Sequence, residues 1–134
     1  MKILVGYNAN EGGSKGLLIA LQQAQSLNAE VVLLTSLISS NSDTFVSDMV
    51  DDSKRKIAEA KKNFEAAGIA CTTEIIDRGM QPGEDIVKYA KENQVDLIIV
   101  GVRIRSRVAK LLLGSTSQYT ILKAHCPVLS YNYK

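Results

Sequence analysis

The chain has 134 residues, of which 46% are hydrophobic and 22% are charged, and its formal net charge at pH 7 is +2. A chain of this length and composition fits one globular domain with a single core, residues 1–134, and is too apolar for a disordered protein. The nearly balanced charge argues against nucleic-acid binding as the main role, because that role usually needs a concentrated basic surface.

No apolar stretch approaches the length of a membrane span, and the apolar run after Met1 is too short for the core of a signal peptide. We therefore expect a cytoplasmic protein without a membrane segment. Cys71 and Cys126 have no partner at metal-ligand spacing, so we expect both to be small buried hydrophobic residues. His125, the only histidine, is expected in a turn or at the surface rather than in a catalytic site.

The expected elements alternate between strands and helices along the whole chain. Short apolar runs predict strands over Lys2–Tyr7, Glu30–Leu37, Cys71–Asp77, Asp96–Val100 and Pro127 to the end of the chain. Apolar residues spaced three or four apart predict helices over Ser14–Leu27, 46–67, from Pro82 onward, and from Ser115 to about Ala124.

Local signals add detail to the helices. Ser14 is the expected N-cap of the first helix, whose inner face is predicted to contain Leu17, Leu21 and Ala24. Gly68 is the expected stop of the long second helix, whose charge run predicts a solvated face with ion pairs one turn apart. In the third helix, the first-turn carboxylates Glu84 and Asp85 are expected to complement the helix dipole, and Ile86, Val87 and Ala90 to form the inner face.

This alternation predicts an α/β fold with a doubly wound, five-stranded parallel sheet in the order 3-2-1-4-5 and helices on both faces. The polar residues of Cys71–Asp77 favour an edge position for the third strand. In such a sheet, ligands bind beyond the carboxyl ends of the strands, where the strand order reverses. The loops 8–13 and 101–113 are expected to face each other across that crevice.

A candidate anion site follows the fourth strand. Gly101 is followed by the basic residues Arg103, Arg105, Arg107 and Lys110, and then by Gly114-Ser115-Thr116 at the start of a helix. A helix N-terminus offers unpaired N–H groups and the positive end of its dipole, and glycines can adopt positive φ and approach a ligand closely.

Other nucleotide and catalytic motifs are missing from the sequence. The glycines near the N-terminus match neither the P-loop pattern nor the Rossmann GxGxxG pattern. The first strand is followed by Asn8 and Asn10, not by the acidic cluster of a receiver domain. With one histidine, no Ser-His-Asp arrangement is credible, and we expect no catalytic or metal residue.

From end to end, the chain resembles the universal stress protein family. The resemblance rests on the segments KILVGY, RGMQPGEDIVKYAKENQVDLIIVG and KLLLGSTSQYTILKAHCPVL. The family's nucleotide motif is G-x2-G-x9-G-[ST], and three of its four marked positions are present here, as Gly101, Gly114 and Ser115. Ile104 replaces the second glycine, and Asn8 stands where the family usually has aspartate.

The resemblance implies that the protein binds ATP, ADP or AMP, with Mg²⁺ as an accompanying ion, and forms a homodimer through the last strand, Val128 to Tyr133. Gly101 and Arg103 would lie beside the ribose and phosphates. The backbone of Gly114 to Thr116, with the Ser115 hydroxyl, would bind phosphate. The other implied nucleotide-binding residues are Tyr7, Asn8, Ser36 (through its backbone) and Val100.

Two functions remain open at this point, and recognition of nucleic acid through the basic loop is a third one that would need strong salt-dependent binding of oligonucleotides to support it. One is a nucleotide-binding stress-response or regulatory dimer that passes its state to a partner protein, with catalysis limited to slow ATP hydrolysis. The other is a protein-interaction dimer that has lost nucleotide binding, which the β-branched Ile104 favours because such a residue disfavours positive φ. In the first case, Arg103, Arg105 and Arg107 would supply phosphate contacts.

Overall fold

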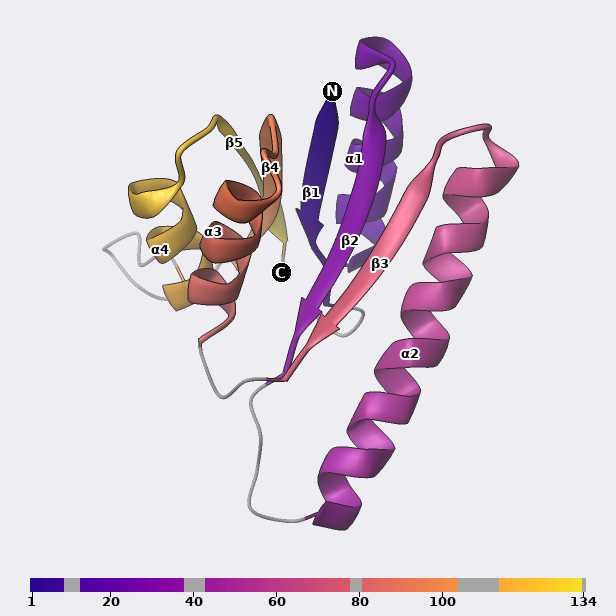
Figure 1. Cartoon of the computed structure of the whole chain (residues 1–134), viewed down its shortest axis with the longest axis vertical. Helices are drawn as coiled ribbons and strands as arrows, with labels where there is room; N and C mark the ends of the chain where they lie inside the picture. Colours follow the sequence, from indigo (N-terminus) through magenta and orange to yellow (C-terminus); the bar gives the residue numbers. More distant parts are fainter. Residues whose placement is uncertain (9–12, 38–42, 78–80, 104–113, 134) are drawn as a thin grey trace.

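The computed structural model describes residues 1–8, 13–37, 43–77, 81–103 and 114–133, without the side chains of residues 43–47 and 49. Strands and helices alternate throughout the described residues (Figure 1). The strands are β1 (Lys2–Gly6), β2 (Glu30–Ser36), β3 (Cys71–Ile76), β4 (Leu97–Arg103) and β5 (Val128–Tyr133). The helices are α1 (Gly13–Leu27), α2 (Asp43–Ala66), α3 (Pro82–Glu92) and α4 (Ser115–Lys123).

The strands form one parallel sheet in the order β3-β2-β1-β4-β5, which confirms the predicted topology. β1 and β4 are central neighbours, paired from Ile3↔Leu97 to Val5↔Ile99. β3 lies at an edge, as its polar residues predicted. Because the strands are parallel, their carboxyl ends meet along one edge of the sheet, and the strand order reverses there between β1 and β4.

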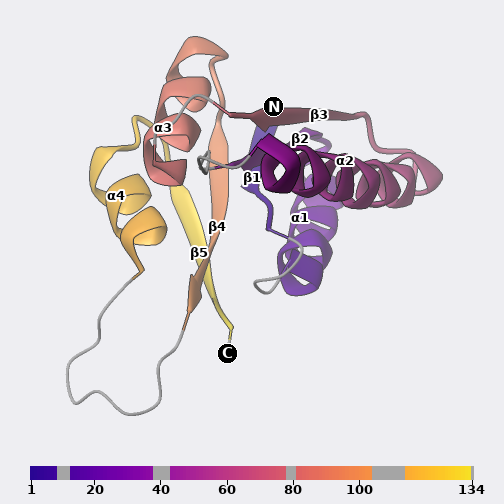
Figure 2. The ribbon, with the colours of Figure 1, turned by 90° about the horizontal axis from the view of Figure 1, so that it is seen from below.

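Helices cover both faces of the sheet (Figure 2). α1 and α2 pack on one face, and α3 and α4 pack on the other. Because strand side chains alternate between faces, Ile3 and Val5 join Phe64 of α2 in one buried cluster, whereas Leu4 joins Ile86 of α3 in the other. The central strands are therefore buried on both sides, as expected of a parallel sheet.

The inner face predicted for α1 is confirmed at Ala24, and Leu17 and Leu21 pack against the core cluster, but three further residues of the helix are more deeply buried than these leucines. Its fully buried residues are small ones, namely Gly13, Gly16, Ala20 and Ala24, whereas Leu17 and Leu21 are only partly buried. Small residues let the helix approach the sheet closely, and a Cβ atom on Gly16 would collide with the Tyr131 hydroxyl group. Ser14 is not the N-cap, because the helix begins at Gly13.

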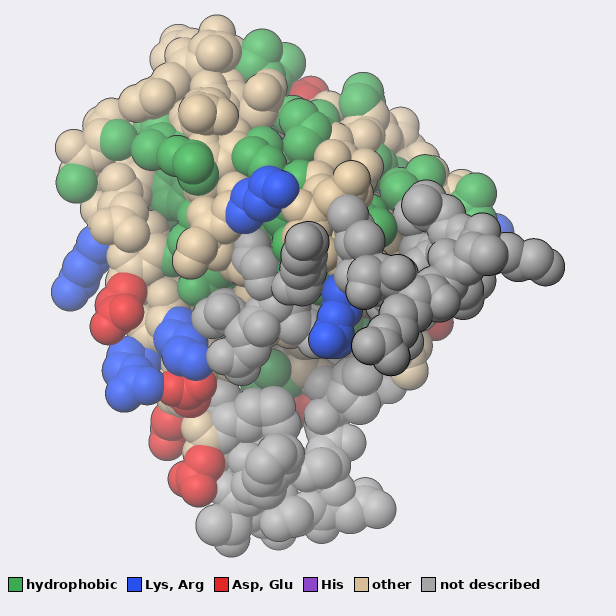
Figure 3. Space-filling model, turned by 180° about the vertical axis from the view of Figure 1, so that it is seen from behind, with side chains coloured by type: hydrophobic (Ala, Val, Ile, Leu, Met, Phe, Trp, Pro, Cys, Tyr) green, Lys and Arg blue, Asp and Glu red, His purple; other side chains and the backbone are tan. Residues whose placement is uncertain are grey.

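The long helix α2 agrees with its sequence pattern. The chain leaves the helix through Gly68, whose φ of +78° is the left-handed conformation that favours glycine at a helix end. Asp52 forms ion pairs with Arg55 and Lys56, one turn further along. Acidic and basic side chains lie together along the edge of the molecule where α2 runs (Figure 3), which confirms a solvated charged face.

β4 extends further than predicted. The sequence placed its end at Val100, but the strand continues to Arg103 because the ladder with β5 continues through Gly101↔Tyr131 and Arg103↔Tyr133. Gly101 is therefore a strand residue rather than the first residue of a loop. None of the described helices is long and apolar enough to cross a membrane.

Candidate functional site

A cavity of about 130 Å³ lies where β1 and β4 end, at the reversal of the strand order. It is lined by six of the nine residues that the family resemblance assigns to nucleotide binding, namely Tyr7, Asn8, Ser36, Val100, Gly101 and Thr116. The other described residues that line it are Gly6, Leu34, Pro82, Ile86, Tyr131 and Tyr133. Residues from β1, β2, α3, β4, α4 and β5 thus meet at one place, although they are far apart in the sequence.

The other three predicted residues, Arg103, Gly114 and Ser115, do not line this cavity. Arg103 is exposed at the end of β4, and Gly114 and Ser115 are exposed at the N-terminus of α4, whose next residue, Thr116, does line the cavity. Ile104 and the basic residues 105, 107 and 110 lie outside the described part of the chain. The described geometry therefore places a cavity beside an exposed helix N-terminus.

Gly114 is the N-cap of α4, with φ −59° and ψ 152°. Its carbonyl oxygen accepts the Gln118 N–H and the Ser117 hydroxyl. Among the described residues beyond its chain neighbours, the nearest atom to a Cβ on Gly114 would be Ser117 Oγ at 3.8 Å, so the described part of the chain leaves this space open. Among the described glycines, only Gly68 has a positive φ. Gly101 and Gly114 therefore do not adopt the positive φ that the sequence suggested. Their role is to leave room for neighbouring groups because they have no side chain.

Two tyrosines of β5 close one side of the cavity. The ring centroids of Tyr131 and Tyr133 are 6.3 Å apart and both rings approach Gly101, where a Cβ atom would be 2.9 Å from Tyr133 Cε1. Burial raises the pKa of the Tyr131 phenol, and Tyr133 adds to the increase, so Tyr131 stays protonated at neutral pH. The sequence interpretation treated this strand only as a dimer edge. The alternation of Tyr131 and Tyr133 along it was the available signal that both lie on one face.

The exit of β1 is fixed by neighbouring β2. The Tyr7 N–H donates to the Leu34 carbonyl oxygen at 2.8 Å, and the Thr35 hydroxyl donates to the Tyr7 carbonyl oxygen at 3.0 Å. Burial raises the pKa of the Tyr7 phenol as well. These bonds place the exposed residue Asn8 at the cavity, where its carboxamide can both donate and accept hydrogen bonds.

Asp85 is buried next to the cavity residue Ser36, which was not predicted from the sequence. The Ser36 hydroxyl donates a 2.5 Å hydrogen bond to Oδ2 of Asp85, whose side chain is 0% exposed. The sequence assigned Asp85 to the helix dipole alone. Its position beside Ile86, on the stripe that also contains Ala90, was the signal that Asp85 faces the core and needs a hydrogen-bonding partner there.

The cavity combines apolar walls with a few polar groups. Leu34, Ile86 and Val100 provide apolar surface, while Ser36 and Thr116 provide hydroxyl groups. Within the described ranges, no three His, Cys, Asp or Glu side chains are grouped to hold a metal ion. Such walls suit a flat heteroaromatic group, and the adjoining helix N-terminus suits an anion.

Two of the relatives found by sequence comparison match part of the chain at moderate identity. The chain is 33% identical to universal stress protein MJ0531 of Methanocaldococcus jannaschii over 79 residues, which are 59% of this chain and 45% of that protein. It is 36% identical to MJ0577 of the same organism over 81 residues, 60% of this chain and 49% of that protein. The matched stretch thus spans about half the length of these relatives.

Comparison with solved structures covers nearly the whole chain. The MJ0577 structure has a TM-score of 0.79 at 26% identity and covers 99% of this chain and 96% of that one. The universal stress protein of Archaeoglobus fulgidus in complex with dAMP has a TM-score of 0.74 at 25% identity. That match covers 97% of this chain and 96% of the Archaeoglobus chain. The sequence model of the universal stress protein family matches residues 1–131. This chain belongs to the universal stress protein family.

Proposed function

We propose that the protein binds an adenine nucleotide (ATP, ADP or AMP) in the cavity between β1 and β4 and acts as a stress-response or regulatory module. One observation carries the proposal: Ser36, Gly101 and Thr116, from three separate segments, line one cavity at the reversal of the strand order. The relative from Archaeoglobus fulgidus in complex with dAMP supports an adenine nucleotide as the ligand.

The nucleotide would lie with its base in the cavity and its phosphates toward α4. The cavity, at about 130 Å³, is smaller than the roughly 300–1,000 Å³ of pockets that hold a whole ligand. It therefore suits one part of the nucleotide, the base, between Leu34, Ile86 and Val100. The phosphates would extend to the open N-terminus of α4, where the Ser115 hydroxyl and the N–H groups of the first turn are available.

The role of the nucleotide is proposed to be regulatory. The polar groups around the cavity are hydroxyls and a carboxamide, which bind and orient a ligand but are weak general bases at neutral pH. Any ATP hydrolysis would therefore be slow. Mg²⁺ would be held mainly by the phosphates rather than by a protein cage. The bound state would be passed to a partner protein by a homodimer formed through β5.

Binding is tested by titrating the purified protein with ATP, ADP and AMP in a calorimeter, with and without Mg²⁺. We expect saturable binding of at least one nucleotide, and weaker phosphate binding in Ser115→Ala. Mass spectrometry of the denatured protein would show whether a nucleotide co-purifies. If none of the three produces heat and none co-purifies, the proposal is wrong.

The second candidate function is a dimer that interacts with other proteins and binds no nucleotide. Ile104, in place of the second motif glycine, favours it. The distinguishing variant is Ile104→Gly. If wild type binds no nucleotide and Ile104→Gly does, this candidate replaces the first; if both bind, Ile104 is no obstacle.

A further inference from the structure

We infer that Ser36 and Asp85 make this site select purines with a 6-amino group over purines with a 6-oxo group. The inference rests on the proposed function, because it concerns the base of the nucleotide bound there. Its starting point is the hydrogen bond in which the Ser36 hydroxyl donates to Asp85 Oδ2 at 2.5 Å.

Because its proton is used in this bond, the Ser36 oxygen can only accept further hydrogen bonds. A serine hydroxyl has one proton and two lone pairs, so once its proton is donated it can only accept. Asp85 is 0% exposed, and its Oδ2 atom accepts the hydrogen bond that the Ser36 hydroxyl donates. The hydroxyl proton is therefore directed at Asp85, and Ser36 Oγ presents lone pairs to a ligand in the cavity.

The strand order places Ser36 at the base end of the site. Ser36 is the last residue of β2, and β1 and β4 follow next in the sheet, with Thr116 of α4 on the far side of the cavity. A nucleotide whose phosphates lie at α4 therefore directs its base toward β2. The edge of a purine farthest from the sugar contains position 6, so its substituent there comes closest to Ser36.

A 6-amino group donates hydrogen bonds, whereas a 6-oxo group only accepts. The amino group of adenine complements the lone pairs of Ser36 Oγ, but the oxygen of hypoxanthine would face another acceptor. A 6-oxo purine would have to shift within the slot to present its N1–H instead. Leu34, Ile86 and Val100 form the walls that oppose such a shift. A buried mismatch of this kind typically weakens binding about tenfold to a hundredfold.

The test compares AMP with IMP, which differ in the base and share the ribose and phosphate. We expect wild type to bind AMP about tenfold to a hundredfold more tightly than IMP by calorimetry. Ser36→Ala should bring the two affinities close together. In Asp85→Asn the amide can donate to Ser36 Oγ, which frees the hydroxyl proton for the ligand, so the AMP preference should fall or reverse.

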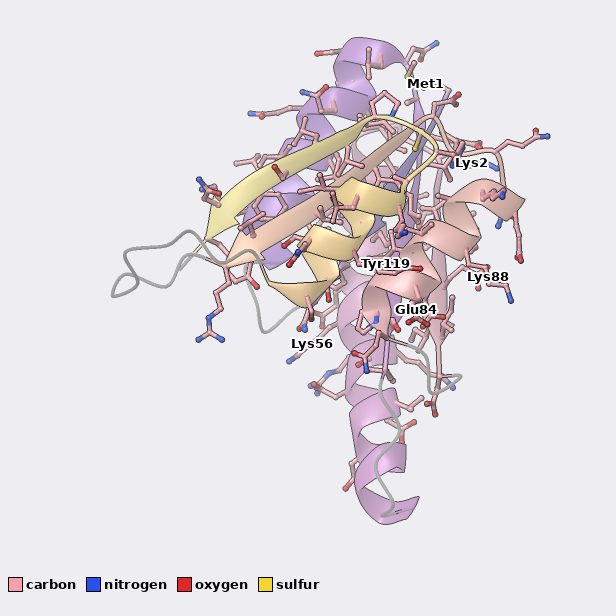
Figure 4. All side chains as sticks on the ribbon, turned by 90° about the vertical axis from the view of Figure 1, so that its left-hand side faces the viewer. Met1, Lys2, Lys56, Glu84, Lys88 and Tyr119 are labelled. Atoms are coloured by element: carbon pink, nitrogen blue, oxygen red, sulfur yellow. The ribbon has the colours of Figure 1, made fainter. Side chains whose placement is uncertain are left out.

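Glu84→Gln is the matched control. Glu84 lies on α3 (Figure 4) and is partly buried. It belongs to the same first turn as Asp85, so this variant removes a negative charge from the same helix end and leaves the Ser36–Asp85 pair in place. It should keep the AMP preference. Circular dichroism checks that each variant is folded, and Ser36→Ala serves as the test if Asp85→Asn is not.

The possible results separate the two proposals. Equal affinities of wild type for AMP and IMP would overturn the inference and leave nucleotide binding intact. A folded Asp85→Asn or Ser36→Ala variant with an unchanged AMP preference would also overturn it. If wild type binds neither nucleotide, the proposed function fails, and the selectivity fails with it.

Discussion

The ring of Tyr131 lies against the backbone of Gly101, with its Cζ atom 3.0 Å from where a Cβ atom would be. Glycine in the interior of a strand normally costs about 0.5–1 kcal/mol relative to alanine. Here it makes room for Tyr131 and Tyr133, which also line the cavity. The first glycine of the nucleotide motif therefore has a packing role within the chain itself.

Gly101→Ala should lower the free energy of unfolding by about 1–3 kcal/mol, because the new methyl group must displace a buried ring. The cost should be smaller in a Tyr131→Leu background, which removes one of the two rings that crowd Gly101 and leaves that of Tyr133. Urea unfolding of the two single variants and the double variant measures the coupling. Strictly additive effects would show that Tyr131 is not what excludes a side chain at Gly101.

Gly114→Ala should leave the free energy of unfolding nearly unchanged and weaken the binding of ATP. Among the described residues beyond its chain neighbours, the nearest atom to the new Cβ is Ser117 Oγ at 3.8 Å, and φ −59° suits any residue. The free energy of unfolding should therefore change by less than about 1 kcal/mol, because the weaker N-cap is offset by a less flexible unfolded chain.

The same methyl group would stand in the open space at the α4 N-terminus, where a phosphate would approach the N–H groups. Calorimetry should therefore show ATP affinity reduced about tenfold or more, with Gly101→Ala as the comparison that also loses stability. Unchanged ATP affinity in Gly114→Ala would place the phosphates elsewhere.

The strand order and the place of the cavity could be predicted from the sequence, because alternating apolar runs determine a parallel sheet whose ligand site lies at the order reversal. What could not be predicted depends on contacts between distant segments. The pairing of Gly101 with Tyr131 extends β4 beyond Val100. The Tyr131 hydroxyl group also lies so close to α1 that only a glycine fits at chain position 16 in that helix. The partnership of Ser36 with Asp85 spans 49 residues, so no local pattern indicates it.

The two cysteines differ in burial: Cys71 is buried, as expected, whereas Cys126 is only partly buried. Burial raises the pKa of the Cys71 thiol to about 11, with Lys61 opposing the shift and Glu65 adding to it. In an unfolded chain a cysteine thiol titrates near about 8.5. Below that pH both states hold the proton. Between it and about 11 the unfolded state has lost a proton that the folded state keeps, so stability falls as the pH rises.

Cys71→Ala isolates this contribution, because other groups titrate equally in both proteins. The difference in free energy of unfolding between wild type and Cys71→Ala, from urea curves at several pH values, should be constant up to about pH 8 and then shrink. A difference that stays constant through about pH 10 would contradict the raised pKa.

A homodimer through β5 would need the outward-facing backbone of that edge strand. The Ile98 N–H donates to the Pro127 carbonyl oxygen, so by alternation residue 129 faces β4 and Ser130 faces away from it. Asn132 also faces away, and its carbonyl oxygen accepts a hydrogen bond from Lys15 Nζ of α1 at 2.6 Å. An outward N–H group at Ser130 is thus available for pairing with a second copy.

Ser130→Pro should therefore separate dimerisation from folding. Proline removes the outward N–H of Ser130 and leaves the ladder with β4 intact, as is tolerated in edge strands. If the protein dimerises through β5, this variant should sediment as a folded monomer where wild type sediments as a dimer. The matched control, Leu129→Pro, removes an N–H that faces β4 and should lower the free energy of unfolding instead. A Ser130→Pro variant that remains as dimeric as wild type would contradict an interface in which the outward N–H of Ser130 pairs with a second copy.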